Sequence, residues 1–135
     1  MIQKMTLYSV RDWLKTLGIG ENFYVGRLED KKEKSLGVYK RDEKTADRIC
    51  VGGYENNGYE TLKVSILLHW NKSARETEDA GIQLFNELRK YRGGGFYIGS
   101  NFVNGVRLAT TCAVDVGADN KKIFERVIWL DIIYK

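Results

Sequence analysis

Apolar residues recur at helical spacing near the start of the chain. Between residues 6 and 17 they stand three or four positions apart, which places them along one side of a helix. These residues are Leu7, Val10, Leu14 and Leu17. Thr6 offers a side-chain oxygen to the first turn, and Gly18 permits the left-handed backbone that ends many helices. The pattern predicts a helix over residues 6–17.

A second helical pattern occupies residues 74–91. Its predicted buried positions are Thr77, Ala80 or Gly81, Leu84, Leu88 and Tyr91. Ser73, followed three residues later by Glu76, is a capping box, in which each side chain binds a free backbone amide of the first turn. Acidic residues stand in the first turns and basic residues in the last, as the helix dipole favours. We predict a helix from Ala74 to Tyr91, ended by the glycines at 93–95.

Alternation of apolar and polar residues predicts strands elsewhere. It is clearest over residues 59–70, where Leu62, Val64, Ile66, Leu68 and Trp70 share one side and Leu67 is the one aliphatic residue on the other. The other predicted strands lie at 22–28, 35–41, 96–102, 106–116 and 122–134. The turn GADN joins the last two, which predicts an antiparallel hairpin. Residues 42–58 are predicted to form a long loop with room for a short strand at 49–51.

The order helix, strands, helix, strands predicts an α+β fold. We expect one domain over residues 1–135, with one antiparallel or mixed β-sheet and two α-helices packed on one face. A chain of this length buries about two thirds of its unfolded surface, so its core needs no disulfide or metal. Cys50 and Cys112 match no ligand or redox spacing, and we expect reduced thiols, with Cys112 in the core.

The closing strand has two different faces. We expect one face, made of Phe124, Ile128, Leu130, Ile132 and Tyr134, to join the core. The other face carries apolar residues that a solvated sheet does not normally expose together. Either a loop of the same chain or a neighbouring subunit covers this face, and we favour the subunit because tryptophan is typical of interface anchors. The predicted subunit interface is Leu67, Val127, Trp129 and Ile133.

Residues that carry catalytic chemistry are scarce. His69 is the only histidine and has no cysteine nearby, so the usual metal sites cannot be built around it, and we expect a surface or hydrogen-bonded strand histidine. Glu76, Glu78 and Asp79 could hold magnesium, but the helix dipole explains the same residues. The chain has neither a phosphate-binding glycine motif nor a nucleophile elbow. We therefore expect no enzyme, no cofactor and no metal.

The net charge of +4 and the pI near 9.0 raise the question of nucleic acid. Aromatic residues beside cations could stack bases, the candidates being Phe23 and Tyr24 with Arg27, and Tyr39 with Lys40 and Arg41. Acids alternate with bases over residues 29–48, however, which leaves that segment nearly neutral. A small nucleic-acid-binding accessory protein is therefore the alternative hypothesis. No apolar run approaches the ~20 residues that cross a bilayer, and the N-terminus lacks a secretory pattern.

Three stretches together resemble a known family. They are FYVGRLEDKKEKSLGVYKR (23–41), YETLKVSILLHWNKSARETEDAGIQLFNEL (59–88) and IFERVIWLDIIYK (123–135). The combination resembles the small minor capsid proteins of phages, which are similar to the tail terminator proteins of long-tailed phages. The second stretch is the most distinctive, because a strand containing ILLHW leads through a helix cap into a helix with an acidic start. The resemblance implies a sheet with helices against one face and no catalytic residues.

The same resemblance implies a structural role in a phage or prophage virion. Such a protein caps the tail tube and provides the surface that joins the head. Its expected partners are other copies in a hexameric ring, the tail tube protein and a head–tail connector protein, without membrane or specific nucleic acid. It would be made in the cytoplasm of the bacterial host and reside in the virion. The charged loops at 29–34 and 41–57 are candidates for these contacts.

Overall fold

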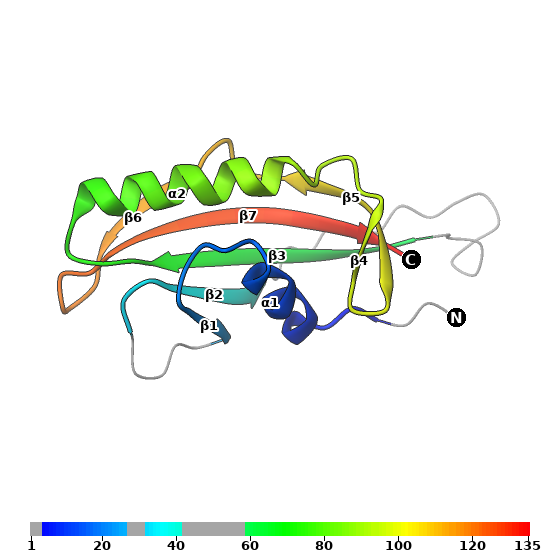
Figure 1. Cartoon of the computed structure of the whole chain (residues 1–135), viewed down its shortest axis with the longest axis horizontal. Coiled ribbons are helices and arrows are strands. Elements are labelled where there is room, and N and C mark those ends of the chain that lie inside the picture. Colours follow the sequence, from blue (N-terminus) through cyan, green and yellow to red (C-terminus); the bar gives the residue numbers. More distant parts are fainter. Residues whose placement is uncertain (1–3, 27–31, 42–58) are drawn as a thin grey trace.

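The computed structural model describes residues 4–26, 32–41 and 59–135, which form two helices and a seven-stranded mixed sheet (Figure 1). The elements are α1 (Leu7–Lys15), β1 (Asn22–Val25), β2 (Ser35–Lys40), β3 (Glu60–His69), α2 (Ala74–Arg89), β4 (Phe96–Ile98), β5 (Asn101–Leu108), β6 (Val114–Ala118) and β7 (Phe124–Tyr134). The predicted α+β class with one mixed sheet is confirmed. The loop expected at 42–58, its short strand at 49–51 and Cys50 lie outside the described residues.

β7 occupies the middle of the sheet. The strand order is β1-β2-β3-β7-β5-β4, and β6 pairs with the other half of the β7 edge that β5 uses. β1 and β2 are parallel, whereas the remaining pairs are antiparallel. β3 and β7 pair without a break from Glu60 opposite Tyr134 to His69 opposite Glu125. The predicted antiparallel hairpin is present, because β6 pairs with β7. β7 arches across the molecule (Figure 1).

The prediction of one strand over 106–116 is wrong. β5 starts at Asn101 because it forms a hairpin with β4, and it ends at Leu108, six residues before β6 begins. The bend between them brings the buried Ala113 to α2, where a Cβ placed on Gly81 would lie only 2.9 Å from that of Ala113. Contact with the helix explains the break, which periodicity could not reveal. The bend also leaves Cys112 exposed, so its assignment to the core is wrong.

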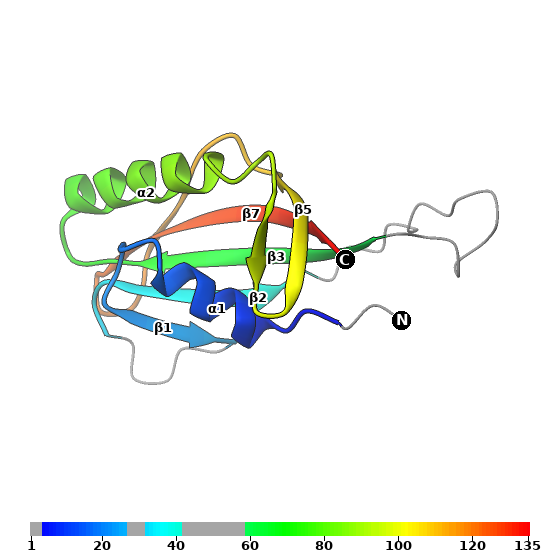
Figure 2. The same ribbon diagram turned by 45° about the vertical axis from the view of Figure 1, so that its right-hand side comes forward.

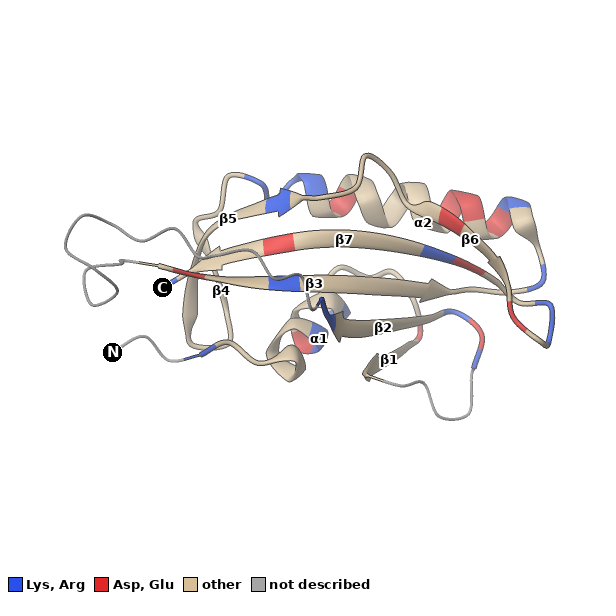
Figure 3. Ribbon diagram, turned by 180° about the vertical axis from the view of Figure 1, so that it is seen from behind, with Lys and Arg blue, Asp and Glu red and all other residues tan. Residues whose placement is uncertain are grey.

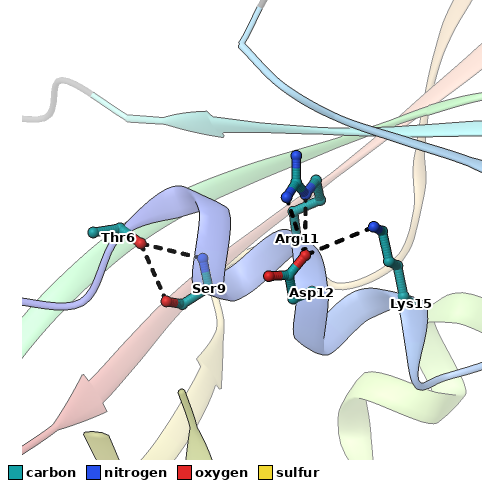
Figure 4. A network of polar contacts seen from close by, with 5 residues as sticks. All are labelled: Thr6, Ser9, Arg11, Asp12 and Lys15. Carbon is teal, nitrogen blue, oxygen red and sulfur yellow. Dashed lines mark hydrogen bonds and ion pairs between the residues drawn. The ribbon is translucent and has the colours of Figure 1, made fainter. Parts of the chain in front are cut away.

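α1 begins where the sequence places it. The Thr6 side chain accepts a hydrogen bond from the Ser9 amide at 3.2 Å, which satisfies a backbone donor of the first turn (Figure 4). On the exposed side, Asp12 pairs with Arg11 at 3.1 Å and with Lys15 at 3.7 Å. The helix ends at Lys15, two residues earlier than predicted.

The start of α2 uses half of the predicted capping box. Ser73 Oγ accepts from the Glu76 amide at 3.2 Å, as expected. The Glu76 carboxylate does not return to Ser73, however, because it accepts from Asn71 Nδ2 at 2.9 Å, and the Ser73 amide donates to Asn71 Oδ1 at 3.0 Å. The helix ends at Arg89 rather than Tyr91. Its buried residues are the predicted Thr77, Ala80, Gly81, Leu84 and Leu88.

Both helices contribute to one hydrophobic core. The core contains the predicted side of β3 from Leu62 to Leu68, and Ile128, Leu130, Ile132 and Tyr134 of β7. α1 contacts β1, β2 and β4, whereas α2 contacts β5 and β7 (Figure 2). The helices thus lie over different strands, and their packing on one common face stays a prediction.

An aromatic cluster joins elements that are far apart in the sequence. Trp13 of α1 stacks on Phe96 of β4, with ring centroids 5.6 Å apart, and meets Tyr91 edge-on at 5.3 Å. Tyr91 follows the end of α2 and lies 4.8 Å from Phe96. Aromatic pairs at such distances add to the burial energy of each ring, so the cluster couples α1 to the far end of α2 and to β4.

We predict that Ile66→Ala destabilises the protein by about 2–5 kcal/mol, because Ile66 is 0 % exposed and its loss leaves a cavity in the middle of β3. Chemical denaturation followed by circular dichroism measures this change. Gln83→Ala on the exposed side of α2 is the control, with an expected change within about 0.5 kcal/mol. An unchanged midpoint for Ile66→Ala would contradict the assigned core.

Candidate interaction surface

The side chains of the sheet that point away from the core form what we call the second face. Directly paired residues share a face, so this face is organised in rows that cross the strands. One row is mostly apolar and consists of Tyr24, Gly37, Leu67, Val127 and Val114. The next row contains Tyr39, Ser65 and Trp129. Together the two rows form an apolar patch that spans five strands.

The structure brings together three of the four predicted interface residues. Leu67 lies directly opposite Val127, and Trp129 follows on the same face of β7. Ile133 is on this face too, but Asp131 separates it from Trp129, and it pairs with Thr61. Sequence reasoning missed Val114 and Tyr24, because their places in the row depend on strand pairing that periodicity does not reveal.

The patch is open to solvent at its centre and at one edge. Trp129 is 42 % exposed and Val114 is 40 % exposed, while Leu67 and Val127 are half-buried. The bend after β5 supports the backbone of Trp129, because the Ala109 amide donates to the Trp129 carbonyl at 2.8 Å. A large aromatic side chain thus stands on a rigid central strand with much of its surface exposed.

A buried charge network lies beside Trp129. Asp131 is only 4 % exposed, and its Oδ1 accepts from Arg41 Nη2 at 2.7 Å. Its Oδ2 pairs with Arg107 through Nη2 at 2.9 Å and Nε at 3.1 Å. The Arg41 guanidinium also lies 5.2 Å from the centre of the Trp129 ring, in a cation–π contact. The carboxylate therefore orients the cation that supports the tryptophan.

Asp131 alternates with apolar residues along β7, a pattern typical of a solvated strand position, but the network buries it. Its partner Arg41 stands 90 residues away along the sequence, so no local spacing indicates the pair. Two of the residues considered for stacking or binding nucleic acid are engaged within the protein. Arg41 is buried against Asp131, and Phe23 packs against the core. Figure 3 views the sheet from behind and shows a long uncharged stretch in both β3 and β7.

His69 is fully buried at the end of β3. Its Nδ1 lies 2.9 Å from Glu125 Oε2, and its Nε2 lies 3.8 Å from Asp119 Oδ2. Asp119 shapes the turn before β7, because its Oδ1 accepts from the amides of Lys121 and Ile123 at 2.9 and 3.0 Å. The hydrogen bond to Glu125 therefore joins the end of β3 to the start of β7.

Ser35 lies opposite His69, so a serine, a histidine and a glutamate share one row of the sheet. This row is not arranged for nucleophilic catalysis. Ser35 is 0 % exposed, and its hydroxyl donates to the Lys32 carbonyl at 2.6 Å rather than to His69. A substrate could not reach the hydroxyl, and the base is not aligned to activate it.

The remaining candidate sites show little chemistry. Glu76, Glu78 and Asp79 are exposed on α2, and the described part of the chain contains no group of three metal-ligating side chains. A shallow depression of about 380 Å³ is lined by Arg92, by residues 105–108 and by Ile133. The hydrogen bond and charge of Glu87 raise the pKa of Lys90 on the surface. Over the described ranges, no helix has the length and apolar character to cross a membrane.

No protein-family model matches the chain, and no curated protein matches it. On the second face, an exposed tryptophan meets an arginine that a buried carboxylate holds in place.

We predict that Asp131→Ala destabilises the protein by about 3–5 kcal/mol, because it removes the carboxylate that balances the buried Arg41. Denaturant titration measures the loss. Arg107→Ala is the matched control, with an expected cost of at most about 1 kcal/mol, because the Arg107 side chain is 71 % exposed. Equal effects of the two substitutions would show that the buried pair has no special role.

Proposed function

We propose that this chain is a structural subunit of a phage or prophage virion. It acts as a tail terminator or minor capsid protein, which forms a ring that caps the tail tube and presents the surface that joins the head. The observation that carries this proposal is the apolar patch of the second face, centred on the 42 % exposed Trp129. The resemblance of three stretches to phage minor capsid proteins supplies the biological setting.

The patch has the properties of a binding anchor. Trp129 stands on the central strand, so little backbone freedom is lost when a partner covers it. Asp131 holds Arg41 against the Trp129 side chain, and this contact restrains the indole before a partner binds. Large aromatic residues near the centre of an interface, surrounded by polar groups, contribute most of the binding energy in many complexes.

The buried titratable groups support a structural role. Asp131 pairs with two arginines, and His69 joins the end of β3 to the start of β7 through Glu125. Each group stabilises the sheet through these contacts. A ring subunit requires such rigid surfaces and no reactive group. The proposed partners are other copies in a hexameric ring, the tail tube protein and a head–tail connector protein.

We predict that Trp129→Ser leaves a folded chain that no longer forms the ring. The reason is that the substitution removes the largest exposed apolar side chain of the patch while leaving the core face of β7 intact. Native mass spectrometry and light scattering should show a large assembly for the unchanged protein and a 15.5 kDa species for the variant. Circular dichroism checks that the variant is folded.

Tyr97→Ser is the matched control, because Tyr97 is an exposed aromatic residue, 67 % exposed, on β4 at the edge of the sheet. This variant should retain the ring. A Trp129→Ser variant that unfolds would instead place the tryptophan in the intramolecular core. An unchanged protein that stays monomeric and binds DNA with an affinity that collapses as salt rises would support a nucleic-acid-binding accessory protein.

A further inference from the structure

We infer that β6 of one copy pairs antiparallel with β1 of a neighbouring copy, so that the sheets of successive subunits join edge to edge. This inference rests on the proposed function and names the strands through which copies meet. It is drawn from the backbone groups, directions and faces of the two strands, which lie at opposite edges of the sheet (Figure 1).

β6 is an exposed strand with one free edge. Among the described residues it pairs only with β7, and all five of its residues are exposed. The Trp129 carbonyl accepts from the Ala109 amide, so the backbone groups of Trp129, and of Val127 two residues earlier, face the edge of β7 that β5 and β6 share. Val127 pairs with Val114, and the N–H and C=O of the next residue, Asp115, therefore point away from the sheet.

β1 has a free edge with complementary groups. In the described part of the chain it pairs only with β2. The amides of Asn22 and Gly26 donate toward β2 at 3.3 and 2.8 Å. The N–H and C=O groups of Phe23 and Val25, which alternate with these residues, therefore point outward. One outward amide and one outward carbonyl on each strand can exchange two hydrogen bonds between copies.

Strand direction and face select the same pairing. β6 runs opposite to β1, so a neighbour in the same orientation presents its β1 antiparallel to β6. When Asp115 lies opposite Phe23 of the neighbour, the outward backbone groups meet and Val114 lies opposite Tyr24. Both Val114 and Tyr24 belong to the second face, so the apolar row continues into the neighbouring sheet, where valine packs on tyrosine. Trp129 is diagonal to Val114 on this face, which places the patch beside the junction.

Other strands fit the β6 edge less well. A second β6 would bring two Asp115 carboxylates close together, whereas β1 carries no charged residue. β4 has only three residues and contacts α1. The bulge before Gly117 and the charge of Asp115 are devices that protect a free edge in many sheets. Protection alone does not explain why Val114 and Val116 are 40 % and 52 % exposed on the same strand.

Disulfide trapping between two variants tests the pairing. In a Cys50→Ser, Cys112→Ser background, Val114→Cys and Tyr24→Cys are placed in separate chains. In the inferred register their Cα atoms lie about 4.5 Å apart, within the range of a disulfide. We expect mild oxidation of the mixture to give a covalent dimer, and oxidation of either variant alone to give none. Val114→Cys mixed with Tyr97→Cys is the matched control, because Tyr97 is exposed on the edge strand β4, and it should give none.

A backbone substitution gives a second measurement. Asp115→Pro removes the outward N–H, which the edge of a sheet tolerates, while Asp115→Ala loses the same carboxylate and keeps the N–H. The proline variant should need a concentration about tenfold higher than the alanine variant to assemble, because one hydrogen bond between copies is lost.

The outcomes separate this inference from the proposed function. Crosslinking of Val114→Cys to itself or to Tyr97→Cys as readily as to Tyr24→Cys would overturn the inference and leave the proposed function standing. Assembly without any crosslink, or equal assembly of the two Asp115 variants, would do the same. An unchanged protein that never assembles would instead refute the proposed function.

Discussion

The pairing of β7 on both of its edges is the constraint on which the rest of the structure depends. β3 pairs with β7 along one edge, while β5 and β6 share the other. Because both edges are hydrogen-bonded to other strands, only the side chains on the two faces of β7 remain for packing or binding. Ile128, Leu130 and Ile132 build the core from one face, whereas Trp129 stands on the other. Core stability and the interaction surface therefore depend on the same strand.

Asp131 shows how closely these two roles are connected. A buried carboxylate is costly unless it is paired, and here it is paired with two arginines from β5 and the end of β2. The network holds strands together that are distant in sequence. It also positions Arg41 against Trp129. The pairing of a buried carboxylate therefore influences how an exposed tryptophan is held.

The polar network and the apolar patch support the same functional proposal from different directions. The hydrogen bond between His69 and Glu125 joins β3 and β7 at one end of the sheet, and the Asp131 network joins strands nearer its middle. These contacts hold the second face in place, which lowers the entropic cost of the proposed binding to another subunit.

The sequence alone determined both helices, the cap at Thr6, the buried stripe of α2 and the two faces of β3 and β7. These features depend on local spacing, since a helix or strand repeats over few residues. It also predicted that Leu67, Val127, Trp129 and Ile133 share a face, because alternation decides which side chains point the same way, but Asp131 separates Ile133 from the other three.

Only the tertiary structure decided what depends on distant pairs. The break between β5 and β6 follows from Ala113 meeting Gly81 of α2, and alternation continues through the break without any local sign. The burial of Asp131 and His69 follows from partners 90 and 56 residues away. The extension of the patch to Val114 and Tyr24 required the strand order. Sequence spacing reports neighbours along the chain, whereas charge pairing and helix packing join residues that are neighbours only in the folded sheet.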